Sequence, residues 1–267
     1  MYQCIKFIIS ILVLGNITFN CLADSKVQRE FNHQLKSDIK EANITVYLPE
    51  DYHQSQQQYS VLYTTAGNRR FELMKAILDW HTHVDWSPIP PLILVSVPTI
   101  TDGKKQNKYD GASGKFNLAT TQWLKTALLP FIKANYRAAG KQILEGFSSY
   151  GNLPIYVYQK QPQLFDAYIS LSPALSLDKS GLIENFTTKK MKNNKQLYAD
   201  KPLFLSLGSI GQDQKQYQKL TSTLMPLSNY TQITFADDSN NYYLQPPITR
   251  FTLTLEHYFK KITPLAD

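Results

Sequence analysis

The six residues Gly146-Phe147-Ser148-Ser149-Tyr150-Gly151 could place a serine nucleophile on a tight turn. They follow the strand-like run Lys141–Glu145 and precede a helix-like segment. A serine on such a strand-to-helix turn has its hydroxyl exposed at the top of the sheet, and the first backbone N–H groups of the helix face the oxyanion that it would create. The motif therefore predicts nucleophilic attack by a serine hydroxyl on a carbonyl group.

Two serines compete for the nucleophile position within this motif. Ser148 has Gly146 two residues before it, where a side chain would crowd the turn, but Tyr150 stands two residues after it, where a small residue is expected. Ser149 has Gly151 two residues after it, but the bulky Phe147 stands two residues before it. We expect Ser148 to be the nucleophile. Ser149 is the alternative nucleophile. The alternative to any catalytic role is that the serine of this motif merely caps the next helix.

The elements that must position this motif alternate between strands and helices, which is typical of a mainly parallel sheet with helices on both faces. We expect strands at Ile44–Leu48, Ser60–Thr64, Leu92–Val97, Gln142–Glu145, Ala167–Leu171, Leu203–Leu207 and Gln232–Phe235, with Val27–Leu35 as an antiparallel edge strand. We expect helices at Arg70–Trp80, Thr120–Ala134, Asn152–Lys160, Gln214–Leu224 and Ile248–Lys261. The polar segments Thr99–Phe116 and Lys189–Lys195 are expected to be loops. The pattern predicts one α/β domain.

The first 23 residues have the pattern of a cleavable secretory signal. Lys6 precedes the apolar stretch Phe7–Leu14, and Cys21-Leu22-Ala23 gives a small-residue pattern before Asp24. We predict a signal peptide at residues 1–23, a mature domain at 24–267 and a periplasmic or secreted location, with retention or lipidation as the alternatives. Because Cys4 and Cys21 both lie in the signal, the mature domain would contain no disulfide.

The chain is basic, with a formal net charge of +7. Part of the excess is local, in lysine clusters at residues 104–108 and 189–195. Solvated loops explain these clusters most simply, and attraction of anionic ligands or envelope polymers is the alternative. No nucleic-acid-binding motif is present, and no later segment has the roughly 20 apolar residues of a membrane span. We therefore expect neither a nucleic-acid partner nor an integral membrane segment after signal cleavage.

Several motifs, in order along the chain, resemble the putative-esterase branch of the α/β-hydrolase superfamily. This group includes enterobactin-type siderophore esterases and S-formylglutathione hydrolase-like enzymes. The motifs are Val46-Tyr47-Leu48-Pro49, Val61-Leu62-Tyr63-Thr64-Thr65-Ala66-Gly67, Pro90-Pro91-Leu92-Ile93-Leu94-Val95, Leu129-Pro130-Phe131-Ile132 and Gln163-Leu164-Phe165-Asp166-Ala167-Tyr168-Ile169-Ser170-Leu171-Ser172-Pro173. The resemblance implies an α/β-hydrolase fold with a mainly parallel central sheet.

By the same resemblance, two catalytic partners of Ser148 are expected to be missing. The family places its histidine in the loop after the last strand, where this chain has Asn241 nearest the expected position. An amide can hold a hydrogen bond but cannot act as the base that activates a serine. The family's acid follows the preceding strand, where this chain has Gly211, with Asp213 as a weak substitute.

By the same resemblance, the oxyanion hole would consist of backbone N–H groups, which survive the loss of side chains. They would come from Gly67, Asn68 and Ser149. Aromatic residues are expected to line the mouth of the pocket, namely Tyr150, Tyr242 and Tyr243, with Trp80 and Trp86 as further candidates. Such a lining favours a planar or glycan-like ligand, although core or rim packing explains tyrosines as well.

Histidines elsewhere in the chain offer no clear replacement for the base. His257 falls inside the last predicted helix, where a surface or packing role explains it more simply, and the others are His33, His53, His81 and His83. A base from the His81–Trp86 loop is the alternative, and it would be unusual for the fold. The spacing of His81 and His83 suggests a metal site only weakly, because two ligands lack a third histidine or a cysteine nearby. We expect no metal and no cofactor.

Two functions fit these features. The first is an exported serine esterase in which Ser148 attacks an ester carbonyl. The second is a non-catalytic, hydrolase-like binding protein that keeps the pocket and the oxyanion hole, which explains Tyr150, Gly211 and Asn241 together. In either case the expected ligand is a small-molecule ester, of which a siderophore-like ester suits the basic charge and the aromatic residues.

Overall fold

The computed structural model describes residues 27–98, 100, 114–178, 181–184, 193–208 and 214–262. The predicted signal peptide, most of the two predicted polar loops, and both Gly211 and Asp213 lie outside the described residues.

Eight strands form the sheet at the centre of the molecule. They are β1 (Glu30–Leu35), β2 (Ala42–Tyr47), β3 (Ser60–Thr64), β4 (Leu92–Ser96), β5 (Gln142–Phe147), β6 (Ala167–Leu171), β7 (Leu203–Leu207) and β8 (Ile233–Asp237). The α-helices in the described part of the chain are α1 (Asn68–Thr82), α2 (Gly114–Trp123), α3 (Leu129–Asn135), α4 (Asn152–Lys160), α6 (Gln214–Leu224) and α7 (Thr249–Ile262). A π-helical turn, Leu124–Leu128, joins α2 to α3, and 3₁₀ turns lie at Ser148–Gly151, Pro162–Leu164, Leu175–Leu177, Lys195–Leu197 and Met225–Leu227.

The strand order is β1-β2-β4-β3-β5-β6-β7-β8. β1 pairs antiparallel with β2, and β2 with β4, whereas β4, β3 and β5 to β8 pair in parallel. The mainly parallel sheet and the antiparallel edge strand are therefore confirmed. Because the strands from β3 onward point the same way, their carboxyl ends meet at one edge of the sheet, where open α/β sheets place their ligands.

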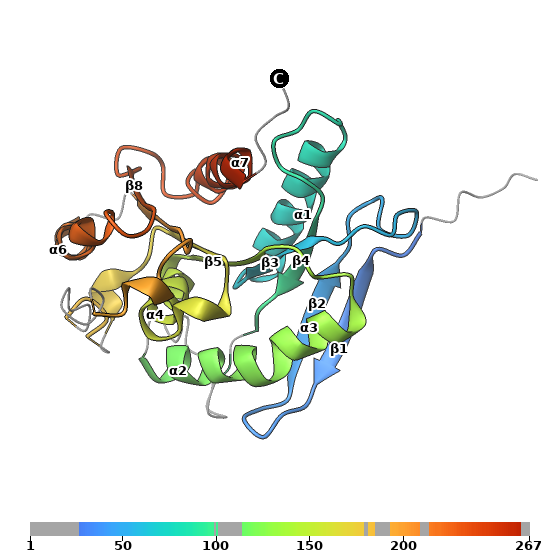
Figure 1. Cartoon of the computed structure of the whole chain (residues 1–267), viewed down its shortest axis with the longest axis horizontal. Helices are drawn as coiled ribbons and strands as arrows, with labels where there is room; N and C mark the ends of the chain where they lie inside the picture. Colours follow the sequence, from blue (N-terminus) through green and yellow to red (C-terminus); the bar gives the residue numbers. More distant parts are fainter. Residues whose placement is uncertain are drawn as a thin grey trace, which may run out of the picture.

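Helices cover both faces of this sheet (Figure 1). On one face, α1 and α7 bury Phe71, Met74 and Phe251 against the strands. On the other face, the α2–α3 helix and α4 pack side chains such as Trp123 and Leu153 into a second, larger core. The parallel strands are apolar along both faces because both are covered, which explains their near-continuous hydrophobic sequences.

The α2–α3 helix is longer than the apolar pattern predicts. It begins at Gly114 instead of Thr120, and Asn117, Thr120 and Thr121 are all buried on its inner face. Hydrophobic periodicity misses a helical turn whose buried residues are polar. The π-helical turn lies just before Pro130, whose ring clashes with the carbonyl group four residues earlier in a regular α-helix and which lacks an N–H.

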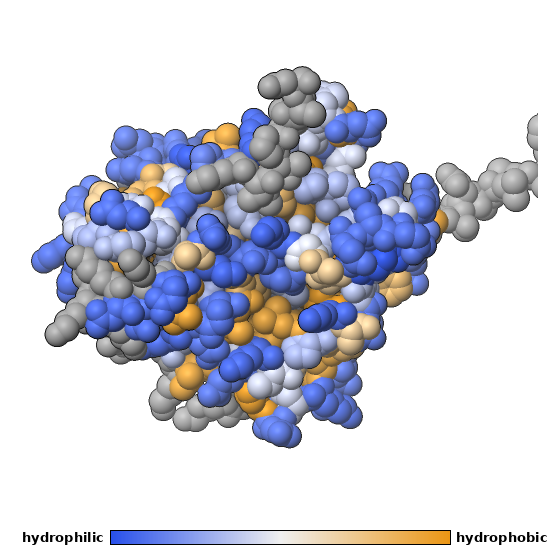
Figure 2. Space-filling view, viewed as in Figure 1, coloured by the Kyte–Doolittle hydropathy of each residue, from blue (hydrophilic) through white to orange (hydrophobic). Residues whose placement is uncertain are grey.

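The surface in this view is mostly hydrophilic, with an apolar area near its middle (Figure 2). Among the described residues, no helix is both long enough and apolar enough to cross a membrane.

Candidate active site

Ser148 follows the last residue of β5, at the carboxyl edge of the sheet, and has a left-handed backbone with φ 60°. This conformation is unfavourable for a residue with a Cβ and persists only where the surrounding structure imposes it. The Ser148 carbonyl accepts a hydrogen bond from the N–H of Ala174 at 3.1 Å, which fixes the turn to the end of β6. The backbone thus has the strained geometry of a strand-to-helix elbow.

Gly146 is required by the close packing of this elbow. A Cβ at this position would lie 2.3 Å from the Tyr150 carbonyl oxygen and 3.0 Å from Thr65 Oγ1. The first turn after Ser148 is 3₁₀ and continues into α4. The Tyr150 backbone therefore closes the turn over Gly146, and its side chain is absent from the lining of the pocket at Ser148.

Tyr243, in the loop between β8 and α7, contacts the Ser148 hydroxyl directly. Its phenolic hydroxyl donates a hydrogen bond of 2.6 Å to Ser148 Oγ, and its ring lies 5.2 Å from the ring of Phe147 between centroids. The sequence predicts Tyr243 as a pocket aromatic but not this contact. A phenol therefore lies where a serine hydrolase needs a base.

Asn241, at the position where the resemblance expects histidine, turns toward a different partner. Its side-chain N–H donates to Asp238 Oδ1 at 3.1 Å, and its backbone N–H donates to the Asp238 carbonyl at 2.9 Å. Asp238 is 2% exposed and pairs with Arg250 Nε at 2.9 Å and Nη2 at 2.6 Å. These hydrogen bonds raise the pKa of Arg250. The Asp238–Arg250 pair anchors the loop that carries Tyr243 to the start of α7.

All five histidines lie in the described part of the chain, and none of them forms a hydrogen bond with Ser148. His33 bonds the Tyr136 hydroxyl, His53 the Gln28 carbonyl, His83 the Trp80 carbonyl, and His257 the Gln232 side chain. His81 lies in the last turn of α1, at the opposite end of the helix from Asn68.

The three predicted oxyanion-hole residues lie at two junctions of strand and helix. Gly67 is the N-cap of α1, with φ −67° and ψ 163°, and Asn68 is the first residue of this helix. Ser149, 7% exposed, lies in the 3₁₀ turn after Ser148. Helix N-termini present backbone N–H groups, so both junctions suit a carbonyl oxygen or an anion.

A buried ion pair lies next to the elbow, between β5 and the start of α1. Glu145 on β5 is fully buried and forms a two-point ion pair with Arg70 of α1, including a 3.1 Å bond from Nη1 to Oε2. Thr64 Oγ1 donates to the same carboxylate at 2.6 Å. The Arg70 guanidinium lies 5.4 Å from the ring centroid of Phe147, the residue before Ser148. The pair thus connects the start of α1 to the end of β5.

A small pocket of about 20 Å³ lies beside Ser148. Its lining comes from the ends of β5, β6 and β7 and from the loop after β8, and comprises Ser148, Ser172, Pro173, Ala174, Leu207, Gly208 and Tyr243. Ser172 and Gly208 are not among the site residues predicted from the sequence. The position of both at the carboxyl ends of parallel strands was the signal that could have identified them.

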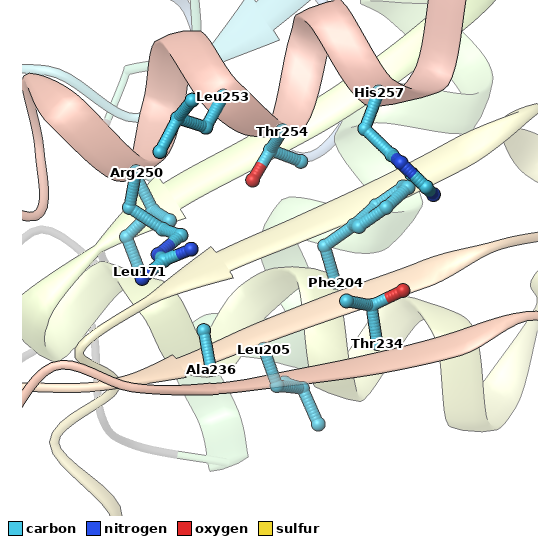
Figure 3. Close-up of a pocket in the computed structure, with 9 residues that line it drawn as sticks. All are labelled: Leu171, Phe204, Leu205, Thr234, Ala236, Arg250, Leu253, Thr254 and His257. Carbon is cyan, nitrogen blue, oxygen red and sulfur yellow. The ribbon is translucent and has the colours of Figure 1, made fainter.

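A larger pocket, of about 280 Å³, lies between α7 and the β6–β8 part of the sheet (Figure 3). Arg250 lies at one end and His257 at the other, with Phe204 and Thr234 on the strands below. Of the sequence-predicted site residues that the structure describes, none lines this pocket.

The other aromatic candidates do not reach the pocket at Ser148. Tyr242 is 73% exposed and is absent from its lining. Trp80 is 69% exposed, and it lies twelve residues beyond Asn68 along α1, about 18 Å at 1.5 Å per residue. Trp86 follows the end of α1 and is 77% exposed. The expectation that both tryptophans share the mouth of the pocket is wrong, because α1 runs away from the carboxyl edge of the sheet.

Gly211 and Asp213, the predicted acid positions, lie outside the described residues. Within the described part of the chain, no group of three or more His, Cys, Asp or Glu residues could hold a metal ion.

Comparisons with known proteins agree on the fold. A family model described as "Putative esterase" matches residues 36–241. An IroE-like serine hydrolase from Shewanella oneidensis is similar in structure, with a TM-score of 0.67, 20% identity, and coverage of 88% of this chain and 81% of that chain. No curated protein sequence matches the chain.

Two further solved structures are similar. The siderophore hydrolase EstA from Aspergillus nidulans has a TM-score of 0.69 at 14% identity, and covers 95% of this chain and 100% of its own. A feruloyl esterase module from Clostridium thermocellum, in complex with sinapinate, has a TM-score of 0.62 at 15% identity, with 90% of each chain covered. At these identities the likeness shows the shared α/β fold.

Proposed function

Because the chain belongs to the putative-esterase family of the α/β-hydrolase superfamily, we propose that it binds an ester at Ser148 without the turnover of a complete serine hydrolase. The observation that carries this proposal is the 2.6 Å hydrogen bond from the Tyr243 hydroxyl to Ser148 Oγ. Phenols ordinarily have a pKa near 10, so a phenol is a poor acceptor for the serine proton at neutral pH. Without a base, the serine hydroxyl is a weak nucleophile.

Ester binding does not require the missing histidine. An ester carbonyl can accept hydrogen bonds from the backbone N–H groups at Gly67, Asn68 and Ser149, which are independent of side-chain identity. Ser148 and Tyr243 add hydroxyl groups. In a serine protease, loss of the triad leaves only about 10³–10⁴-fold catalysis over water, which comes from the oxyanion hole and binding.

For the ligand, we propose a small-molecule ester of the siderophore or hydroxycinnamate type. Proteins of similar structure carry the names siderophore hydrolase and ferulic acid esterase. An anionic catecholate ester also suits the net positive charge of the chain. The pocket at Ser148 admits only a small group, so the rest of the ligand would lie outside it.

A periplasmic or secreted location belongs to the same proposal and rests on the signal-like residues 1–23. Mass spectrometry of protein recovered outside the cytoplasm should give a chain that begins at Asp24. An intact N-terminus in the cytoplasmic fraction would contradict the proposed export.

A serine esterase is the second candidate function, and the strained backbone of Ser148 favours it. A left-handed serine behind Gly146 is the geometry that exposes a nucleophile. In this case a base would have to reach Ser148 after the Tyr243 side chain moved away.

Fluorophosphonate labelling of the purified protein separates the two functions, with Ser148→Ala as the control. We expect wild-type Ser148 to stay unlabelled under conditions that label an active serine esterase within minutes. Equilibrium titration with methyl ferulate and with an iron-loaded catecholate should show binding of at least one of them, and Ser148→Ala should weaken it. Covalent labelling that disappears in Ser148→Ala would establish the esterase instead, and absence of binding to both probes would refute the ester-binding function.

A further inference from the structure

Ser172 occupies the same position on β6 that Ser148 occupies on β5. Phe147 pairs with Leu171 in the parallel register of the two strands, and a serine follows each of them. Both serines have left-handed backbones, with φ 60° at Ser148 and φ 44° at Ser172. Strained residues that neighbour one another at the carboxyl edge of a sheet are typical of functional sites.

Ser172 is only 7% exposed, and its hydroxyl is buried. This hydroxyl has no hydrogen-bond partner within the described part of the chain. Neighbouring buried serines are paired: Ser170 Oγ donates to the Gly151 carbonyl at 2.8 Å, and Ser206 Oγ accepts from the Ser172 N–H at 3.2 Å. A buried hydroxyl without a partner destabilises the fold, so its presence needs an explanation.

The space in front of this hydroxyl is kept open by Gly208. A Cβ on Gly208 would lie 2.4 Å from Ser172 Oγ, so a larger residue would fill the place that a partner of the hydroxyl would take. Gly208, Ser172, Ser148 and Tyr243 line the same pocket of about 20 Å³. A void needs about 10–15 Å³ to admit a water-sized group, so the pocket can receive one oxygen atom.

We propose that Ser172 is a second ligand-binding residue of the Ser148 site and that its hydroxyl donates a hydrogen bond to an oxygen of the bound ester. This inference rests on the ester-binding function proposed above. Tyr243 donates to Ser148 Oγ, which leaves the Ser148 hydrogen available for the same ligand oxygen. This is a ligand oxygen other than the carbonyl oxygen at the backbone N–H groups, and with two lone pairs it can accept from both serines.

The lining also specifies the charge of the ligand group. The lining residues that the structure describes contribute hydroxyls, apolar side chains and backbone, and none of them has a charged side chain. Burial of a carboxylate without a cation is unfavourable, whereas a neutral ester oxygen loses little on entering such a pocket. The site therefore prefers an ester to the corresponding free acid.

The test compares dissociation constants for methyl ferulate and free ferulate, together with thermal stability, in matched serine variants of the full mature chain. We expect Ser172→Ala to weaken methyl ferulate binding about 10-fold, as the loss of one hydrogen bond would. Its stability should stay equal or rise, because the hydroxyl has no hydrogen-bond partner among the described residues. Ser170→Ala, which removes a paired hydroxyl, should lower stability and leave binding unchanged. Wild-type protein should bind methyl ferulate at least 10-fold more tightly than ferulate.

The outcomes separate this inference from the function on which it rests. If Ser148→Ala weakens binding and Ser172→Ala does not, the role of Ser172 is refuted and ester binding stands. A loss of stability in Ser172→Ala as large as in Ser170→Ala would make its hydroxyl structural and refute the inference as well. Ser172→Gly, in which glycine suits the left-handed backbone, replaces Ser172→Ala if the latter does not fold. If wild-type protein binds neither methyl ferulate nor the catecholate, both proposals fail.

Discussion

Glu145→Gln should lower the free energy of unfolding by about 3 kcal/mol, because it leaves the Arg70 charge without its partner in a buried site. The carboxylate is fully buried, the Arg70 side chain is 13% exposed, and their ion pair is two-point with a third hydrogen bond from Thr64. Glutamine keeps the shape of glutamate, so the loss reports the charge and not a cavity. Urea unfolding of both proteins measures the difference.

An exposed ion pair on the same helix provides the control. Lys75 and Glu72 approach to 2.7 Å, but the Glu72 side chain is 62% exposed, and Glu72→Gln should change stability by less than about 0.5 kcal/mol. A double-mutant cycle with Arg70→Met should give a large coupling energy, since removal of both charges is milder than removal of one. Equal effects of Glu145→Gln and Glu72→Gln would show that the buried pair does not support the elbow.

The sequence predicts the sheet well because burial on both faces leaves short, continuous apolar runs. Ser60–Thr64, Ala167–Leu171 and Leu203–Leu207 are predicted with the bounds that the structure has. The start of α2 could not be predicted in this way, because Asn117 and Thr120 are polar residues that face the core. The spacing of apolar residues predicts a helix only where the buried residues are apolar, and the three-dimensional packing determines which polar residues are buried.

The residues of the elbow can be predicted because its backbone geometry is local. The side-chain contacts of the loop after β8 cannot be predicted, because they depend on residues that are distant in the sequence. Gly146 and Ser148 define the elbow because the turn needs a residue without a Cβ at a fixed offset. The loop after β8 offers both Asn241 and Tyr243, and spacing alone favours Asn241, yet Asp238 holds Asn241 while Tyr243 reaches the serine. The Ser172 hydroxyl has no partner among the described residues, and its surroundings come from three strand ends that are far apart in the sequence, so no local pattern predicts them.

Tyr243→Ala should make Ser148 reactive when imidazole is supplied in solution. The phenolic oxygen lies 2.6 Å from Ser148 Oγ, so removal of the side chain opens a space within hydrogen-bond reach of the nucleophile, and the imidazole ring is smaller than the phenol that it replaces. A general base in this place typically accelerates attack by about 10²–10⁴-fold. We expect the rate of fluorophosphonate labelling at Ser148 to rise about 100-fold with imidazole above a pH of about 7, where imidazole is largely neutral.

Three matched variants test whether the reactivity of Ser148 depends on a base in the place of the Tyr243 side chain. Tyr243→Phe keeps the ring in place and should remain unlabelled with imidazole. Tyr242→Ala removes an adjacent side chain that is 73% exposed and lines no part of the pocket, and it should behave like wild type. The double variant Tyr243→Ala/Ser148→Ala should show no labelling, which assigns the reaction to Ser148. If folded Tyr243→Ala gains no reactivity with imidazole, the lack of a base is not the sole reason that Ser148 is unreactive. A base beside a correctly placed serine hydroxyl would otherwise have raised its nucleophilicity.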